Sequence, residues 1–406
     1  MPDTHVPTKR TPHPSASAAP RTIGFLTSDT DPGYYGTLLN VLREVCRPLG
    51  IRLVVFEGRA LHSQVLAPMC YNAVYHAVST HRLDGLLVAT SGMGAVCGPA
   101  RLDEFLSSLK IPTVTIGMPL ASYSGVDVDD ASAVRLALDH LITHERRRIV
   151  YASGPAHIVH SKERLEAYRQ WIADTGTGLG LTEDILFGNF TARSGYELME
   201  RLHGRIGESL DAVCFAIIGI DGIELSGLVT PGLSSASQNV HRMAQIAVDQ
   251  LLQTMAAART DTPNTPLHQV VPFRLLNRRS CGCSARVLPS RNAVLQDIMN
   301  RTVYIGESVQ TFRSDHLFER MEHFLRRKSV SLCFVVIFSD NPKGVNCHGF
   351  TLPPYSRVLL GYANGQRFMS EERFQSLDLL PDALWQQTAG LDLMLKPLFF
   401  ETEVYG

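Results

Sequence analysis

Short runs of apolar, often β-branched residues alternate with segments of helical periodicity between residues 21 and 280, and no other feature constrains the fold as strongly. Between the runs, apolar residues recur at three- and four-residue spacings, as at Leu38, Leu42 and Val45, which is typical of amphipathic helices. Strands that are apolar along their whole length are buried on both faces, and single helices connect such strands as parallel neighbours. The sequence therefore predicts an α/β fold with doubly wound parallel sheets. The predicted strands are residues 23–27, 53–56, 86–89, 113–116, 149–152, 185–187 and 212–220.

Polar and aromatic residues follow several of these predicted strands, at the ends where a parallel sheet binds its ligands. Asp31, Tyr34 and Tyr35 follow the first strand. Ser91 follows the third strand, and Asp221 follows the last. Carboxylates and hydroxyls hydrogen-bond to polyols, and an aromatic ring can stack on a sugar face. Asp, Ser and Thr are also common N-cap residues of helices, so these residues alone leave a ligand site and a set of helix caps open as alternatives.

A series of short motifs follows in a fixed order, from Ile23-Gly24-Phe25 to Thr230-Pro231-Gly232. The motifs between them include residues 31–35, 84–87, 111–117, 126–130, 140–141, 147–149, 154–155, 163–169 and 219–222. This order resembles the sensor domain of LacI/GalR-type transcriptional regulators. The resemblance covers residues 21–280. It implies a periplasmic-binding-protein-like fold of type I, in which two lobes close on a small effector, usually a sugar or a nucleoside.

The resemblance also implies a ligand site in the cleft between the lobes. Tyr34 and Tyr35 would stack on the ligand, while other residues of both lobes would hydrogen-bond to its edge. An arginine offers a planar fork that can bind hydroxyls or a carboxylate, and the alternative for Arg164 is an ordinary arginine on a helix surface. The predicted ligand-binding residues are Asp31, Tyr34, Tyr35, Ser91, Arg164, Asp221 and Gln238.

The beginning of the chain departs from the family pattern, because well-known members start with a helix-turn-helix headpiece that binds the DNA major groove. Residues 1–20 contain five prolines and almost nothing to bury, and we predict that they form a disordered leader. The formal net charge is −1, which gives no overall attraction to nucleic acid or to an anionic membrane. We therefore expect a regulator without its own helix-turn-helix, for which direct DNA binding is doubtful.

A second departure lies within the second lobe. The family carries an Asn-Asp pair, a helix and a turn between two consecutive strands, whereas this sequence passes directly from Ala216 to Ile217. Neighbouring parallel strands need a crossover of about a dozen residues or more. The sequence therefore predicts a shortened second lobe near residues 216–217, with either one merged strand or one displaced strand. Both a working sensor and one that has lost its ligand remain open.

Residues 281–406 show a different pattern, which predicts a smaller C-terminal α+β domain of the GAF/PAS type. Helices are expected at residues 289–301 and 314–328, and strands at 331–338, 357–362 and 393–400. Residues 374–381 and 396–400 resemble a segment that follows LacI-type sensors in some bacterial signalling proteins. Such proteins usually continue into a diguanylate cyclase or a histidine kinase.

Two pairs of residues could each supply half of a zinc site. Cys281 and Cys283 are separated by one glycine, and His140 and His144 lie four residues apart on a predicted helix. Zinc needs four ligands, and neither pair has a second pair close to it in the sequence. We therefore predict two thiols in a tight turn, a solvated helix end, no metal and no cofactor. Neither a Walker motif nor a Gly-x-Ser-x-Gly elbow occurs, which predicts a protein that is not an enzyme.

The function predicted from these features is that of a LacI-type regulatory protein that senses a sugar- or nucleoside-like effector and lacks its own helix-turn-helix. Ligand-driven lobe closure would act on a homodimer. The alternative is the N-terminal input portion of a diguanylate cyclase or sensor histidine kinase. Eight cysteines, mostly in apolar runs, and the lack of a secretory signal predict a cytoplasmic protein. The apolar runs are too short to span a membrane.

Overall fold

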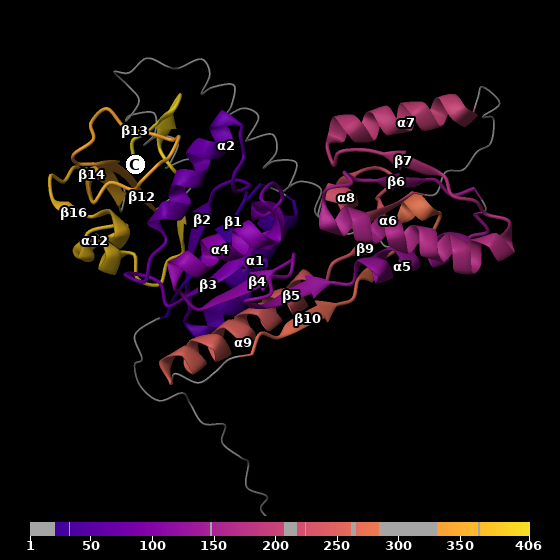
Figure 1. The fold of residues 1–406 in the computed structure, drawn as a ribbon, viewed down its shortest axis with the longest axis horizontal. Helices are drawn as coiled ribbons and strands as arrows, with labels where there is room; N and C mark the ends of the chain where they lie inside the picture. Colours follow the sequence, from indigo (N-terminus) through magenta and orange to yellow (C-terminus); the bar gives the residue numbers. More distant parts are fainter. Residues whose placement is uncertain are drawn as a thin grey trace, which may run out of the picture.

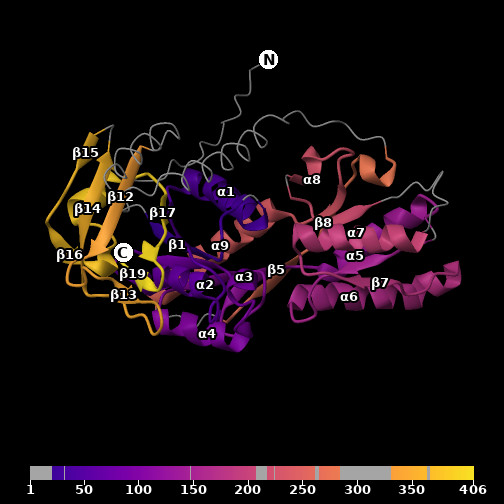
Figure 2. The same cartoon turned by 90° about the horizontal axis from the view of Figure 1, so that it is seen from above.

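The computed structural model describes residues 21–31, 33–146, 148–206, 217–223, 225–260, 265–283, 331–363 and 366–406. The predicted leader, the first half of the strand expected at 212–220 and both helices expected between 289 and 328 lie outside these residues. Figure 1 shows three parts in a row, with the first lobe (indigo and purple) between the C-terminal segment (yellow) and the second lobe (magenta). The view from above in Figure 2 shows the same order.

The first lobe is built on one continuous sheet of seven strands in the order β10-β5-β4-β3-β1-β2-β17, with every neighbouring pair parallel. The strands are β1 (Thr22–Thr27), β2 (Arg52–Glu57), β3 (Gly85–Ala89), β4 (Thr113–Ile116), β5 (Ser124–Val128), β10 (His268–Val271) and β17 (Leu393–Leu395). The parallel sheet and the α/β class predicted from the apolar runs are confirmed.

Alternate residues of these strands pack into two apolar clusters, one on each face of the sheet. Leu53 and Val55 belong to one cluster, which includes residues of α1 (Tyr34–Cys46) and α9 (Val240–Arg259). Val54 and Phe56 belong to the other cluster, which includes residues of α4 (Gly98–Leu109) and the segment after α2 (Leu66–Tyr71). Burial of both faces explains why β1, β2 and β3, in the middle of the described sheet, are apolar along most of their length.

Over the residues that the structure describes, the second lobe contains two small sheets. In one, β6 pairs with β7 in parallel; in the other, β9 lies between β8, to which it is parallel, and β11, to which it is antiparallel. The strands are β6 (Tyr151–Ser153), β7 (Ile185–Phe187), β8 (Ile218–Asp221), β9 (Ser234–Ser237) and β11 (Arg274–Leu276). The helices are α5 (Asp130–Thr143), α6 (Val159–Trp171), α7 (Ala192–Ile206) and α8 (Leu225–Leu228).

Residues 216–217, where the sequence lacks its crossover, lie along the chain between β7 of one described sheet and β8 of the other. In a doubly wound sheet of order 2-1-3-4-5, the third strand lies between the first and the fourth. The strand predicted at residues 212–216 lies outside the described part of the chain. Within the described part, α5 connects the two sheets because it contacts β8, β9 and β11 directly and reaches β6 through α6.

The described chain passes between the lobes at three places, and these places position the candidate site. It passes from β5 into α5, from β9 into α9, and from β10 into β11. Within the described residues, no helix combines the length and the apolar character needed to cross a membrane.

The C-terminal segment forms two small antiparallel sheets and also joins the first lobe. β12 (Leu332–Phe338), β14 (Tyr355–Ala363), β15 (Gln366–Phe368) and β16 (Arg373–Gln375) form one sheet, and β13 (Val345–Asn346), β18 (Phe399–Phe400) and β19 (Glu403–Val404) form the other. The smaller α+β part predicted at the C-terminus is confirmed. The strand expected at 393–400 is instead divided into β17 and β18, since Pro397 between them has no N–H to donate to a ladder.

Several polar and aromatic contacts fix the C-terminal segment to β2. Asp392 accepts a hydrogen bond from the Leu53 N–H at 3.0 Å. The buried Arg52 guanidinium donates to the Leu391 carbonyl at 3.0 Å and stacks on Trp385 of α12 (Asp382–Gln387), 4.0 Å from the ring centroid. These contacts cover the edge that β2 would otherwise expose, and an exposed sheet edge is prone to wrong pairing.

Candidate functional site

The candidate site lies between the lobes, where polar side chains from several elements form one connected network. The first lobe contributes Ser91 from the short helix α3 (Thr90–Met93), which follows β3 directly. The second lobe contributes Arg164 from α6, Asp221 from the end of β8 and Gln238 from the residue after β9. All of these positions except that on α6 lie just beyond the carboxyl end of a strand, where parallel sheets bind ligands.

Arg164 is the centre of the network and is buried, with 8% of its surface exposed. Its Nε donates to Asp130 Oδ1 at 2.5 Å, and its Nη2 donates to Asp221 Oδ1 at 3.2 Å. Burial alone would lower the pKa of Arg164, but the carboxylates of Asp221 and Asp130 outweigh it and raise that pKa. The guanidinium is therefore a fixed positive charge held between two carboxylates.

Asp221 connects Arg164 on α6 to Gln238, the residue after β9. Its Oδ1 also accepts a hydrogen bond from Gln238 Nε2 at 2.8 Å. The backbone of Asp221 has a φ of 78°, in the left-handed region that Asp tolerates better than most residues, and Gly222 follows with a φ of 62°. This turn ends β8 and presents the Asp221 carboxylate to Arg164.

A second branch of the network crosses from one lobe to the other. Ser91 Oγ lies 2.9 Å from His160 Nε2, and His160 Nδ1 lies 2.6 Å from Asp130 Oδ2. The Met118 N–H donates to Ser91 Oγ at 3.0 Å, which fixes the hydroxyl. His160 and Arg164 lie one turn apart on α6, so the single carboxylate of Asp130 holds both side chains.

In this branch the charged forms of Asp130 and His160 stabilise each other. Burial alone would raise the pKa of Asp130, but hydrogen bonds and charges from His160 and Arg164 lower it. Burial alone would lower the pKa of His160, but the Asp130 carboxylate raises it. Asp130 is 3% exposed, so this buried carboxylate depends on its two cationic partners.

The paired tyrosines enter from the first lobe. The rings of Tyr34 and Tyr35 are 5.1 Å apart and inclined at 69°. Burial raises the pKa of Tyr34 well above its usual range, and the Tyr35 hydroxyl and the Asp221 carboxylate contribute to that shift. Both tyrosines also pack against the apolar cluster of the first lobe. Asp31, by contrast, is exposed.

Three residues of this region are additional to the seven predicted for the site: Asp127, Asp130 and His160. Burial raises the pKa of Asp127 to about 6, although His160 opposes the shift. The sequence contained a signal for all three. Asp127 and Asp130 lie at the carboxyl end of β5, and His160 is spaced four residues before Arg164. Asp130, His160 and Glu163 also have ligand atoms within 4.8 Å of one another, but Arg164 already binds that Asp130 carboxylate.

Comparisons with known proteins agree with the motif order. A family model described as a periplasmic binding protein-like domain matches residues 214–281. The HTH-type transcriptional regulator PtxS of Pseudomonas plecoglossicida is 28% identical over 266 residues, which cover 59% of this chain and 73% of that protein. The ribose operon repressor of Escherichia coli strain K12 is 25% identical over 260 residues, covering 57% and 74%.

Further similarity is found to another transcriptional repressor and to a solved structure of a transcriptional regulator. The HTH-type transcriptional repressor PurR of Proteus mirabilis is 23% identical over 287 residues, covering 64% of this chain and 80% of that protein. Among solved structures, the transcriptional regulator CelR–cellobiose complex is 21% identical with a TM-score of 0.49, covering 64% of this chain and 86% of that one.

Proposed function

From the confirmed resemblance of this chain to LacI-type regulators with a periplasmic binding protein-like domain, we propose that it senses a small sugar- or nucleoside-like effector between its two lobes. The observation that carries the proposal is the hydrogen-bonded network that joins Arg164, Asp221 and Gln238 of one lobe to Ser91 of the other. Tyr34 and Tyr35, at the start of α1, would stack on a ring of the ligand. Asp31 completes the proposed set from the loop before α1.

The charges of the network favour a neutral, hydroxyl-rich ligand. Asp127, Asp130 and Asp221 bring three carboxyl groups to the region, against the cations Arg164 and His160. A carboxylate or phosphate on the ligand would meet acidic groups whose positive partners are already engaged. Hydroxyls can instead donate to Asp221 and accept from Arg164 or Gln238 while the Asp130 pairs stay intact.

Ligand binding would be coupled to closure of the lobes. The Ser91–His160 contact already connects them at one point. A ligand that contacts both lobes binds the closed arrangement more tightly and shifts the population toward it, as two-state coupling requires. In a cytoplasmic homodimer, that shift would alter the subunit arrangement and so carry the signal.

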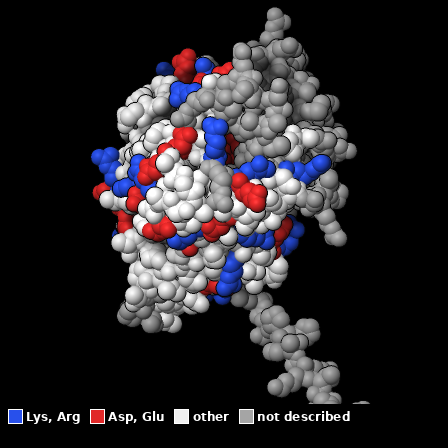
Figure 3. Space-filling view, turned by 90° about the vertical axis from the view of Figure 1, so that its right-hand side faces the viewer, with Lys and Arg blue, Asp and Glu red and all other residues white. Residues whose placement is uncertain are grey.

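The output of the signal is expected through a partner rather than through direct DNA binding by this chain. Figure 3 shows Lys and Arg interspersed with Asp and Glu over the described surface turned to the viewer, and a mixed surface gives little attraction to DNA. The alternative output is a linked diguanylate cyclase or histidine kinase, with this chain as its input portion. A duplex-binding assay at physiological salt distinguishes direct DNA binding from both outputs.

The test is a thermal-shift screen of neutral monosaccharides and nucleosides on the purified chain. A ligand that binds only the folded state raises the melting temperature in a concentration-dependent way. We expect Asp221→Asn to abolish this shift, while the control Glu183→Gln, on the exposed surface, retains it. A ligand-induced shift that survives Asp221→Asn would contradict the proposed site, and the absence of a shift with every compound would contradict the proposed sensor.

One other function deserves a direct test, because Ser91, His160 and Asp130 are connected in the order of a hydrolase triad. Arg164 shares the Asp130 carboxylate, and the Met118 N–H already donates to the Ser91 hydroxyl. We therefore interpret the chain of contacts as a connection between the lobes. Hydrolysis of a p-nitrophenyl ester by the purified chain that Ser91→Ala removes would instead establish a hydrolase.

A further inference from the structure

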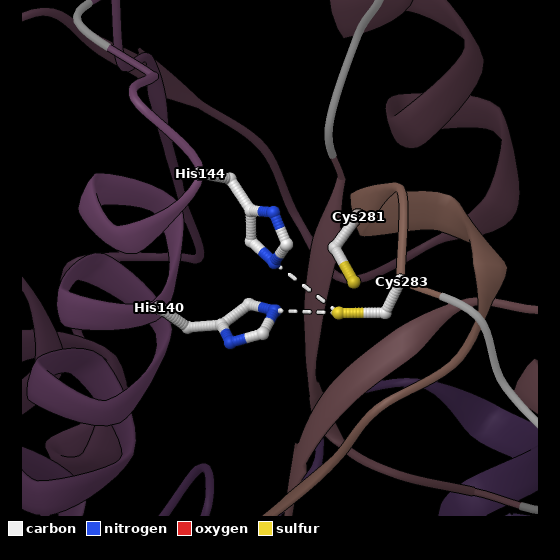
Figure 4. Close-up of side chains that lie close together, drawn as sticks. All are labelled: His140, His144, Cys281 and Cys283. Atoms are coloured by element: carbon white, nitrogen blue, oxygen red, sulfur yellow. Dashed lines mark hydrogen bonds between the residues drawn. The ribbon is translucent and has the colours of Figure 1, made fainter.

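Two residue pairs that are far apart in the sequence meet at one end of the second lobe. His140 and His144 lie at the C-terminal end of α5, and Cys281 and Cys283 lie at and just after the 3-10 helix η5 (Arg279–Cys281). Figure 4 shows the two imidazole rings and the two thiols directed toward one another from these two elements. Each pair alone supplies only two ligands, and the fold brings the two pairs together.

The distances within this group match those of a tetrahedral site. Cys283 Sγ lies 3.2 Å from His144 Nε2 and 3.6 Å from His140 Nε2. One ligand atom from each of the four residues lies within 4.8 Å of the others. Zinc bonds of about 2.3 Å to sulfur and about 2.0–2.1 Å to nitrogen place neighbouring tetrahedral ligands about 3.3–3.8 Å apart. The Cys283–His144 and Cys283–His140 distances are already close to this spacing, so the group needs only a small contraction to surround one ion.

The local backbone also favours this arrangement. Gly282 has a φ of 94°, a left-handed conformation that glycine adopts easily, and it lets the thiols on either side of it approach the same point. The i, i+4 spacing places both histidine rings on one face of α5, with ring centroids 4.7 Å apart. Cys281 is fully buried, and its Sγ lies 3.0 Å from the Ser234 hydroxyl, which holds its position.

We propose that His140, His144, Cys281 and Cys283 form a structural zinc site. Two sulfur and two nitrogen ligands are a donor set that zinc prefers, and four protein ligands leave no open position for catalysis. The inference is independent of the proposed effector site, whose residues do not include these four.

The position of the site indicates what the metal would stabilise. η5 is attached to the β8–β9 sheet, since the Ile217 N–H donates to the Ser280 carbonyl at 3.0 Å and Ser280 Oγ donates to the Ile217 carbonyl at 2.6 Å. α5 packs with α6, which contacts β6 of the other sheet. An ion bound between α5 and η5 would therefore join the two pieces of the second-lobe sheet. It would do so at the end of the sensor, where the chain continues toward its C-terminal part.

The first measurement is the metal content of the full chain, purified in a reducing buffer. We expect about one zinc ion per chain, as a four-ligand site requires. Replacement by Co²⁺ should give the visible absorption bands of a tetrahedral ion together with a thiolate-to-cobalt charge-transfer band. Weak visible absorption of the Co²⁺ form, as an octahedral ion gives, would overturn the proposal. Zinc at background level, with no Co²⁺ uptake after reduction of the thiols, would also overturn it.

Variants then assign the ligands. Cys283→Ser and His144→Ala should each lose the bound zinc and the cobalt charge-transfer or tetrahedral bands, whereas Cys97→Ser and His203→Ala, outside the group, should retain both. If a ligand variant fails to fold, Co²⁺ titration of the wild-type chain after chelation decides the question by its spectrum. Unchanged zinc content in both ligand variants, or a Cys281–Cys283 disulfide that persists in reducing buffer, would contradict the site.

Discussion

The two lobes differ in how they are held together. The first lobe has one continuous seven-stranded sheet with an apolar cluster on each face. The second has two sheet pieces over the described residues, a smaller apolar cluster around Tyr168 and Trp171, and a buried ionic network. Apolar burial stabilises without direction, whereas buried charges stabilise only when every partner is in place.

The two lobes also differ in the groups that they offer to a ligand. The first lobe presents mainly the hydroxyls of Ser91, Tyr34 and Tyr35 to the proposed site, together with the Asp127 carboxyl at the end of β5. The second lobe carries Arg164 and Asp221, the groups that a ligand would engage. Regions that bind and move are commonly drawn from the less stable part of a structure. We therefore expect the second lobe to open before the first.

The largest expected effect comes from the core of the first lobe. Phe56 is fully buried in β2, and Phe56→Ala should lower the free energy of unfolding by about 3–5 kcal/mol because it leaves a cavity. Denaturant unfolding measures the change. The matched variant Leu138→Ala, in the second-lobe cluster, should destabilise that lobe selectively in hydrogen exchange. Equal loss of protection in both lobes from Leu138→Ala would show that they unfold as one unit.

A somewhat smaller effect is expected from the ionic network. Asp130→Asn removes the carboxylate that Arg164 and His160 share, and breaking a buried ion pair by removing one partner costs about 3 kcal/mol or more. The loss should appear in the protection of α5 and α6, while that of β1 and β2 stays unchanged. Asp249→Asn, exposed on α9, serves as the control. A destabilisation no larger than that of the control would mean that water, rather than Asp130, compensates these cations.

A third prediction concerns the covered edge of the first lobe. Asp392→Ala removes the acceptor of the Leu53 N–H and an ion pair with Arg43 at 3.5 Å. We expect a loss of about 1–2 kcal/mol, the usual cost of losing such a bond. Faster proteolysis of the C-terminal segment should accompany it. An unchanged cleavage rate would show that Trp385 and the apolar contacts hold β17 without this carboxylate.

The sequence predicted those parts of the fold that depend on the hydrophobic pattern of neighbouring residues. Hydrophobic periodicity finds β1, β2, β3 and β4 of the first lobe, because these strands are mostly apolar where both faces of the sheet are covered. It misses β5 and β10, which carry polar residues such as Ser124 and His268. It does not find β9, Ser234–Ser237, which is buried although three of its four residues are serines. Its hydroxyls are satisfied within the fold, as where the Arg278 N–H donates to Ser234 Oγ at 2.8 Å, and this compensation is invisible in a hydropathy pattern.

The family motifs mark single residues of the candidate site, and those residues can be predicted from the sequence. The side chains that hold them in place come from distant segments, and the sequence does not predict them. Arg164 and Asp221 were predicted from their motifs, but the Asp130 carboxylate that holds Arg164 lies 34 residues away in sequence. His144 and Cys283 are separated by 139 residues, so spacing alone could not join the two halves of the metal group. Such pairs depend on how elements pack, which the local sequence does not contain.

The smallest predicted effect is a pH dependence confined to the second lobe. Although burial opposes its charge, Asp130 raises the pKa of His160, so the stabilisation from this pair is complete below the unfolded value of about 6.5. It is lost as the pH rises through the raised, folded pKa. Asp127, whose pKa burial raises to about 6, has already lost its own contribution by that point. The lowered pKa of Asp130 contributes only to acid denaturation, far below this range.

Hydrogen exchange measured on both sides of the folded His160 pKa, and corrected for the intrinsic pH dependence of exchange, tests this sign. Protection of α6 should decrease toward higher pH, whereas that of β1 and β2 in the first lobe should not change. His160→Gln keeps a hydrogen-bonding side chain without a titrating charge, so it should flatten the profile of α6. The effect should be smaller than that of Asp392→Ala, because His160 keeps its hydrogen bond to Asp130 when it becomes neutral. If the pH dependence of α6 protection is unchanged in His160→Gln, another group causes it. The ionisation of His160 would then not account for the different pH response of the two lobes.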